Sequence, residues 1–320
     1  LVAISGPIAD RPAARAADLE ARTALWSVAA THPANDIDGV SDWVDSLRRR
    51  GRITRVAADD PIRLLVDALD TIQRVATSRT VGDRRPHPLT VVAASEFGDA
   101  HALDSERPLG ALVADGVTTL AGTDDLRAAW QTFGIQLDQV NSSALTHMLP
   151  GRPGSLLAAA SANGQPLRIT HRMLDSDLGL DVDAIGRVQV CENPTIVVLA
   201  ADQLGPSCRP MVCTDGMPKS VTSRLLAHLR THGCELLVHA DLDAGGVAIV
   251  NHLISSVAAT PWRMTALDYT EALAGPTTEL ATAVGPTPWD PDLVVAMQQH
   301  GRGVHEEAIA STLLADLSAD

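Results

Sequence analysis

Apolar residues recur every three or four positions along the first 80 residues of the chain, which is the spacing of amphipathic helices. Three segments carry this period, and we expect each to be a helix: LEARTALWSVAATH (residues 19–32), VSDWVDSLRRRG (40–51) and PIRLLVDALDTIQRVAT (61–77). The first region of the protein is therefore predicted to be mainly helical.

The pattern is less regular after residue 80. The run LTVVAASEFGDAHALD (89–104) predicts a short strand and a loop, in which Asp99 and Asp104 are placed to cap the next helix. Residues 125–150 carry a helical pattern. Prolines and glycines in PGRPG then interrupt the chain before a small-residue helix, SLLAAASANG (155–164). We place the main domain boundary between residues 150 and 182.

From residue 187 short apolar runs alternate with helical patterns. The strand–helix units are RVQVCENPTIVVLAADQLG, RPMVCTDGMPKSVTSRLLAHLRTHG and CELLVHADLDAGGVAIVNHLISSV, followed by a strand-like piece, TPWRMTALDY. This alternation predicts an α/β fold, with a largely parallel sheet flanked by helices. The predicted organisation is a mainly helical N-terminal region (1–150), a connecting segment (151–182) and an α/β domain that ends in an acidic helix (183–320).

Composition and charge restrict the possible functions. The chain has 320 residues, of which 45% are hydrophobic, so it can fill the cores of two domains. The first residues lack a secretory signal and no apolar run has the length of a membrane span, so we expect a cytoplasmic protein that does not bind membranes. The net charge of −14 argues against a protein that finds nucleic acid through its own overall field. The four cysteines lack zinc-site spacing and are expected to be buried, reduced thiols.

Two aspartates in VHADLDAGGVAIVNHL indicate a candidate site. Asp241 and Asp243 follow an apolar strand, where an unpaired carboxylate is costly. Oxygen ligands of this kind suit Mg²⁺ or Mn²⁺, and the glycines that follow begin a helix whose N–H groups favour anions. DxDxGG is also common in ordinary acidic turns. Glu192 strengthens the prediction, because it leaves the first strand and strand ends meet at one sheet edge.

The order of these motifs resembles a known domain. A glutamate follows the first strand, a GxPxxxxR-like turn follows the second, and DxDxGG follows the third. This order is similar to that of the Toprim domain of topoisomerases, primases, Spo11-like enzymes and several nucleases, over residues 187–265. The turn contributes four residues at the start of its helix: Gly216, Pro218, Thr222 and Arg224. The resemblance implies that residues 183–320 form a Toprim catalytic domain.

Further segments resemble one branch of Toprim proteins, the nuclease subunits of Wadjet-type SMC plasmid-defence complexes (the JetD, MksG or EptD family). They are VCENP, CTDGMPKS, HADLDAGGVAIVN, PWRMTALDY, PWDPDL and GRGVHEEAIASTLLADL, with GDAHALD and SERPLGALV in the N-terminal region. The resemblance implies an endonuclease that uses Mg²⁺ or Mn²⁺ to cleave double-stranded DNA delivered by an SMC-like ATPase with kleisin and KITE-type subunits. A homodimer is expected by analogy, since two sites would explain double-strand cleavage.

The resemblance also assigns roles to the acidic residues. Asp241 and Asp243 would be metal ligands, and Glu192 a ligand or the general base. Glu306 and Glu307 in VHEEAIA are similar to the family's terminal acidic motif. Adjacent helical residues point about 100° apart, so the two are not expected to serve one ion equally, and acids also suit a helix N-terminus. We assign Glu306 first as catalytic residue and ligand, Glu307 as a further ligand, and His305 as a second candidate.

Basic residues supply the candidate DNA contacts. RRRGRITR gathers Arg48, Arg49, Arg50, Arg52 and Arg55, which fits either a solvated helix end or a local phosphate contact. The GMPKS turn adds two further candidates, Lys219 and Arg224.

The single tyrosine separates hydrolysis from transesterification. Topoisomerases and Spo11-like proteins attack DNA with a tyrosine outside the Toprim core, whereas the only tyrosine here is Tyr269, in an apolar context after the DxD strand. Hydrolysis is therefore favoured. The alternatives are a non-catalytic Toprim-fold adaptor that binds DNA, a topoisomerase or Spo11-like enzyme, and a nucleotide-binding enzyme, which no P-loop or GxGxxG supports.

Overall fold

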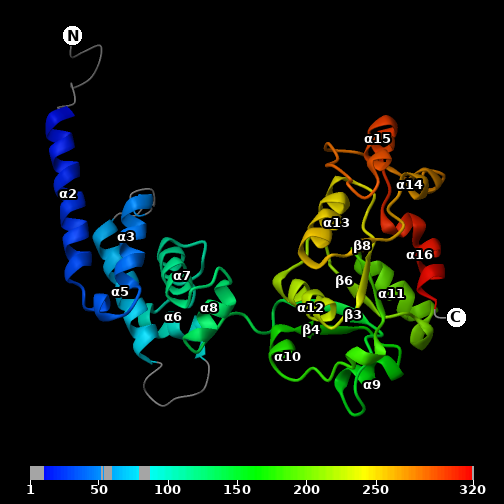
Figure 1. The fold of residues 1–320 in the computed structure, drawn as a ribbon, viewed down its shortest axis with the longest axis horizontal. Coiled ribbons are helices and arrows are strands. Elements are labelled where there is room, and N and C mark those ends of the chain that lie inside the picture. The colour runs from blue at the N-terminus through cyan, green and yellow to red at the C-terminus, as the bar shows by residue number, and fades with distance from the viewer. Residues whose placement is uncertain (1–10, 52, 54–59, 79–86, 319–320) are drawn as a thin grey trace, which may run out of the picture. The chain divides into compact units, whose positions relative to one another are not determined.

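The computed structural model describes residues 11–51, 53, 60–78 and 87–318. The chain forms two compact units that divide after Asp138. The predicted classes are confirmed: helices dominate the first unit, and a mostly parallel sheet forms the centre of the second (Figure 1).

The first unit is a group of helices around one apolar core. Trp43 and Leu47 pack with residues of the neighbouring helices, and the Trp43 indole N–H donates to the Asp115 carboxylate over 3.1 Å. Gly116 brings its backbone against the Trp43 ring, where a Cβ atom would lie 3.0 Å from ring carbon. The elements are α2 (Arg11–Thr31), η1 (Pro33–Asp36), α3 (Val40–Arg50), α5 (Pro61–Ser78), β1 (His87–Pro88), α6 (Leu89–Phe97), α7 (Pro108–Ala121), α8 (Leu126–Thr132) and β2 (Ile135–Gln136).

Three local predictions in this region are wrong. Residues 89–97 form α6 and not a strand, because the apolar run LTVVAAS fits a half-buried helix as well as a strand. Only Leu126–Thr132 is helical within 125–150. Asp99 does not cap α7: it accepts from the Arg107 guanidinium at 2.5 Å, while Asp104 contacts His101.

A six-stranded sheet in the order β4-β3-β6-β5-β7-β8 organises the second unit. The strands β6, β5, β7 and β8 are parallel, and β3 pairs antiparallel with both β6 and β4. The strands are β3 (Ser143–His147), β4 (Leu167–Thr170), β5 (Arg187–Cys191), β6 (Met211–Cys213), β7 (Glu235–Val238) and β8 (Thr260–Pro261).

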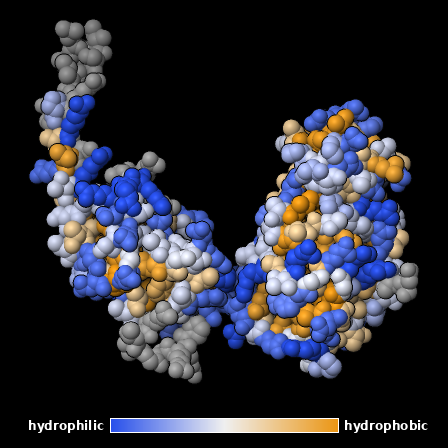
Figure 2. Space-filling model, viewed as in Figure 1, coloured by the Kyte–Doolittle hydropathy of each residue, from blue (hydrophilic) through white to orange (hydrophobic). Residues whose placement is uncertain are grey.

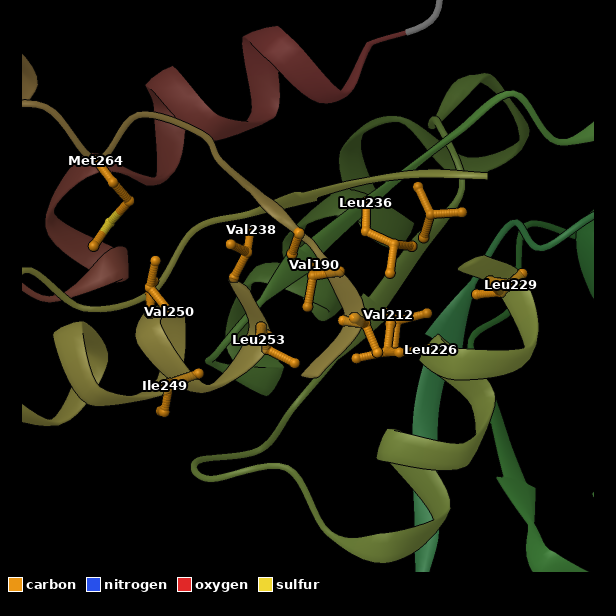
Figure 3. Close-up of a cluster of buried hydrophobic side chains, with 14 of the residues drawn as sticks. Val190, Val212, Leu226, Leu229, Leu236, Val238, Ile249, Val250, Leu253 and Met264 are labelled. Atoms are coloured by element: carbon orange, nitrogen blue, oxygen red, sulfur yellow. The ribbon is translucent and has the colours of Figure 1, made fainter. Parts of the chain in front are cut away.

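Helices cover both faces of the sheet. Successive strand residues point to opposite sides, so each strand contributes apolar side chains to both cores. Val190 and Val238 pack with Leu226 of α12 and Leu253 of α13 on one face (Figure 3). Cys191, Met211 and Cys213 pack against α11 and α16 on the other face. These helices are α11 (Pro194–Gln203), α12 (Ser220–Thr231), α13 (Ala244–Val257) and α16 (Ala310–Leu317).

The remaining elements extend the second unit at both ends. Predicted strand TPWRMTALDY forms only the two-residue β8 before α14 begins behind a Thr265–Asp268 capping box. The predicted acidic helix begins as a 3₁₀ turn and continues as α16. The other elements are α9 (Leu156–Ala162), α10 (His171–Asp175), η2 (Val182–Ala184), η3 (Gly205–Ser207), α14 (Ala266–Ala272), β9 (Thr278–Glu279), α15 (Pro291–His300), β10 (Arg302–Gly303) and η4 (Glu306–Ile309).

The division between the units lies earlier than the predicted boundary at 150–182. Strands β3 and β4 fall inside the stretch assigned to the N-terminal region and the connecting segment, but they hydrogen bond to each other and β3 to β6. Strands β3 and β4 precede the βαβ units in the sequence and pair antiparallel. The strand–helix alternation therefore did not indicate that they belong to the sheet. The second compact unit consequently spans residues 139–320.

The distribution of hydrophilic residues and of cysteines between surface and interior fits the composition of the chain. Hydrophilic residues cover most of the visible face of each unit, with hydrophobic residues scattered between them (Figure 2). The four cysteines are buried and free, as predicted. None of the helices in the described part of the chain has the length and apolar character needed to span a membrane.

Candidate metal centre

Two neighbouring parallel strands bring Glu192 and Asp241 together. Glu192 directly follows β5, and Asp241 is the third residue after β7. These strands pair in parallel with Val190 opposite Val238. The chain leaves β5 toward β6 on one side and β7 toward β8 on the other, so the strand order reverses between them. Open α/β sheets bind ligands at such a reversal. The Asp241 N–H donates to the Glu192 carboxylate over 3.1 Å, which fixes the two residues side by side.

Asp243 begins helix α13. Its side chain caps the helix by accepting the Gly246 N–H at 2.8 Å. A Cβ atom at Gly246 would lie 1.9 Å from the Asp241 backbone oxygen, so glycine is required where the chain turns back on itself. The DxDxGG pattern therefore forms a tight turn that holds both aspartates at the start of the helix.

The C-terminal segment closes the same site. Leu242 and Val304 form an antiparallel bridge, which brings the next residue, His305, to the aspartates. The His305 Nδ1 atom lies 2.7 Å from the Asp241 carboxylate. Ligand atoms of Asp241, Asp243 and His305 all lie within 4.8 Å of one another, the only such group of three or more histidine, cysteine or acidic residues in the described part of the chain.

Glu306 is completely buried behind this group. Its carboxylate accepts the Glu192 N–H at 3.1 Å and the Asn193 N–H at 2.6 Å, and its own N–H donates to Asp241 at 2.8 Å. Glu306 thus ties the ends of β5 and β7 together. Glu307 is exposed and accepts from the Asn193 side-chain amide at 2.6 Å.

The charges of the site are strongly coupled. Burial, and then the negative charge of Asp241, raises the pKa of Glu192 to about 7. Burial also raises the pKa of Glu306 well above its usual value, against the opposing effect of the backbone N–H groups. The hydrogen bond to Asp241 raises the pKa of His305. Carboxylates gathered in a half-buried place repel one another, and a bound cation would relieve that repulsion.

The donor set fits a divalent cation. Carboxylate oxygens suit Mg²⁺ and Mn²⁺, and an imidazole nitrogen is better tolerated by Mn²⁺ than by Mg²⁺. Asp241 and Asp243 offer oxygens that converge on one position, with the imidazole of His305 beside them. Glu192 borders the same position through its bond to Asp241.

Comparison with protein families divides the chain in two. Residues 1–151 match a family described as "Protein of unknown function N-terminus (DUF3323)". Residues 167–317 match one described as "Protein of unknown function C-terminus (DUF2399)". The chain combines a DUF3323 domain with a DUF2399 domain. A search of the curated proteins gave no match. The whole candidate metal centre lies within the DUF2399 domain.

The predicted acidic residues come together in the DUF2399 domain, but in different positions. Asp241 and Asp243 belong to the group of three side chains that they form with His305, and Glu192 adjoins it. The carboxylate of Glu306 turns toward backbone N–H groups, and His305 takes the place next to the aspartates. Sequence could not rank these neighbours, because the Leu242–Val304 bridge sets which side chain faces the site. Asn193, which contacts Glu306 and Glu307, was not predicted as a site residue. Its place next to Glu192 in VCENP was the only signal for it in the sequence.

The predicted DNA-contacting residues are dispersed over both domains. Arg48, Arg49 and Arg50 are exposed in the last turn of α3, with Arg50 3.8 Å from Asp115. Arg52 and Arg55 lie outside the described residues. In the DUF2399 domain Lys219 is exposed and lies 3.4 Å from Asp215, in the loop after β6. Arg224 is engaged by its own domain, through His171 and Asp175.

Tyr269 is fully buried in α14 of the DUF2399 domain. Its hydroxyl donates to the Arg302 carbonyl over 2.7 Å. Burial raises the pKa of this hydroxyl. The only tyrosine of the chain therefore has the packing role predicted for it.

Proposed function

We propose that the protein is a metal-dependent DNA endonuclease that hydrolyses phosphodiester bonds at the centre formed by Asp241, Asp243 and His305. The observation that carries this proposal is the convergence of these three side chains beside Glu192 at the strand-order reversal between β5 and β7. Carboxylates grouped in this way suit a cation that in turn binds a phosphate.

We assign different roles to the residues of the site. Asp241 and Asp243 would hold Mg²⁺ or Mn²⁺, with Glu192 or His305 completing the ligand set. When bound, the ion supplies charge neutralisation at the phosphate and acidifies water. Glu192, which lies beside Asp241, is placed to accept a proton from the attacking water. Glu306 holds the ends of the two strands together and keeps Glu192 and Asp241 in register.

Hydrolysis is favoured over attack by tyrosine. A Spo11-like or topoisomerase mechanism requires a tyrosine hydroxyl that reaches the DNA backbone. Tyr269 is buried and its hydroxyl is bonded to the Arg302 carbonyl. Water is consequently the nucleophile that we propose.

The substrate that we propose is plasmid or foreign double-stranded DNA delivered by an SMC-like ATPase complex with kleisin and KITE-type subunits. The resemblance of the sequence to Wadjet-type nuclease subunits supports this. The net charge of −14 supports delivery, because an acidic protein has low affinity for free DNA. Arg48, Arg49, Arg50 and Lys219 are exposed and would contact phosphates locally. A homodimer, testable by light scattering, would cut both strands.

Nicking of supercoiled plasmid in Mn²⁺ tests the proposal. We expect Asp241→Asn to lower the cleavage rate by at least about a hundredfold, because it removes a ligand charge and weakens the bond to His305. A calorimetric titration with Mn²⁺ in the absence of DNA should show weaker Mn²⁺ binding in the same variant. Asp202→Asn, which changes an exposed aspartate of α11, is the matched control and should cleave as the wild type does.

Two outcomes would contradict the nuclease proposal. One is equal nicking by the wild type and Asp241→Asn, which indicates a contaminating nuclease. The other is an inactive wild type in the presence of its SMC-like partners and Mn²⁺. The second outcome would favour the alternative function, a non-catalytic Toprim-fold adaptor that binds DNA.

A further inference from the structure

A chain of four side chains runs from α10 to the start of α12. The Arg224 guanidinium donates to the Asp175 carboxylate over 2.8 Å and, through its other terminal nitrogen, contacts Nδ1 of His171 at 2.9 Å. Nε2 of His171 lies 2.9 Å from the Ser220 hydroxyl oxygen. His171 is fully buried, whereas Arg224 and Asp175 are partly exposed.

The chemistry of arginine determines the tautomer of His171. A guanidinium has five N–H donors and no acceptor, so it can only donate to Nδ1. Nδ1 must therefore carry the lone pair, and the imidazole is neutral with its proton on Nε2. That proton is donated to the Ser220 oxygen. The two bonds from Arg224 through His171 to Ser220 thus run in one direction, while a separate N–H of Arg224 donates to Asp175.

Ser220 occupies a structurally important position. It is the first residue of α12, directly after the loop that leaves β6. That loop also contacts the candidate metal centre, because the Asp215 N–H donates to the Glu192 carbonyl over 3.0 Å. Lys219, next to Ser220, lies 3.4 Å from Asp215. No side chain caps α12 at Lys219, so the bond from His171 is the side-chain contact that fixes its first residue.

We propose that Arg224 is a positioning residue that acts through His171 and Ser220 to hold the β6–α12 loop against Glu192, and that it is not a contact for DNA phosphate. This replaces the role predicted for Arg224 from the sequence. Its guanidinium is already shared between Asp175 and His171, so turning it to a phosphate would break both of these bonds. The effect on cleavage rests on the proposed nuclease function, whereas the tautomer of His171 does not.

The tautomer is measured first, by NMR of protein labelled with ¹⁵N-histidine. We expect the His171 signal, assigned with a His171→Asn variant, to show a proton on Nε2 alone. Arg224→Met removes the donor and should release this fixed tautomer. Arg172→Met removes an exposed arginine beside His171 and is the matched control, in which the tautomer should be unchanged.

DNA binding and cleavage then separate positioning from phosphate contact. Affinity for a fluorescein-labelled duplex is measured in Ca²⁺ at several salt concentrations. Arg224→Met should keep the wild-type salt dependence, while Lys219→Met should reduce the slope of log K against log salt by about one. With saturating plasmid and Mn²⁺, we expect Arg224→Met to cleave about tenfold more slowly or worse, because a small misplacement of the site is costly.

Either of two results would overturn the proposal: a lower salt slope in Arg224→Met, or a His171 tautomer that this variant leaves unchanged. If Arg224→Met fails to fold, Ser220→Ala provides the test, since it keeps Arg224 and removes only the last acceptor. Wild-type cleavage by a folded Ser220→Ala would then contradict the positioning role. A wild type that does not cleave DNA would contradict the proposed function alone, and the tautomer and salt measurements would still decide the role of Arg224.

Discussion

Gly246 shows how a single residue allows the candidate metal centre to form. Its backbone lies against the Asp241 carbonyl, where a Cβ atom would be 1.9 Å from oxygen. Its N–H is also the donor that holds the Asp243 carboxylate, at 2.8 Å. Any side chain at this position must therefore move both aspartates, although neither is itself changed.

We accordingly predict that Gly246→Ala destabilises the protein by about 1–3 kcal/mol, the usual cost of overpacking, and weakens Mn²⁺ binding. Thermal unfolding and calorimetric Mn²⁺ titration measure the two effects. Gly245→Ala is the matched control, because its Cβ would meet only the tip of the Asp243 side chain at 3.3 Å. The explanation fails if the two variants bind Mn²⁺ equally well.

At the scale of elements, the C-terminal helix α16 is held to the segment after β8. Asp316 accepts two bonds from the Arg263 guanidinium, at 2.7 and 2.8 Å, and one from the Trp262 indole at 2.8 Å. Leu313 and Leu317 of the same helix cover the sheet face that carries Cys191. Because η4 and His305 precede α16, anchoring this helix also keeps the terminal segment at the candidate metal centre.

The pKa of Asp316 makes this anchor sensitive to acid. Bonding to Arg263 lowers the pKa below its ordinary value of 3.8, so folding favours the carboxylate. The unfolded chain binds the proton more readily, and the stabilisation is therefore complete above pH 3.8 and is lost as the pH falls through the folded pKa. Arg263 is 37% exposed, so solvent screens the pair and its contribution is modest.

We predict that Asp316→Asn lowers the free energy of unfolding by about 1 kcal/mol at pH 7 and by less below about pH 4. Urea unfolding at several pH values measures this difference, and amide hydrogen exchange should increase in α16. Glu235→Gln breaks the more exposed pair with Arg187 and should change the stability by less than about 0.5 kcal/mol. A difference that stays constant down to acid pH would contradict the assigned cause.

The elements that sequence predicted well are those whose pattern is local. Helices α2, α3 and α5 and the alternation from β5 to α13 each repeat at their own period. The meeting of Glu192 with Asp241 followed from parallel strand ends. Strand β3 was assigned to a helix, because its identity depends on pairing with β6, more than 60 residues later along the chain. The burial of Glu306 could not be predicted for the same reason, since it depends on Glu192 and Asn193, over 110 residues away.

For the whole molecule, the boundary between the two units is where sequence and structure differ most. The family matches end at residue 151 and begin again at 167, close to the predicted boundary. The compact units divide after Asp138, because β3 lies between β4 and β6 in the sheet. A domain that begins after residue 150 would lack β3 and would leave β6 with an exposed edge and β4 without a neighbour.

Two fragments distinguish these boundaries. We predict that residues 139–320 fold alone and unfold cooperatively, since the six strands and the helices on both faces are then complete. Residues 151–320 should lose cooperativity and aggregate, because Ala144 leaves the core and the β6 edge is open. Circular dichroism during heating and size-exclusion chromatography measure both properties. Equal stability of the two fragments would mean that β3 is dispensable and that the boundary lies where the sequence patterns placed it.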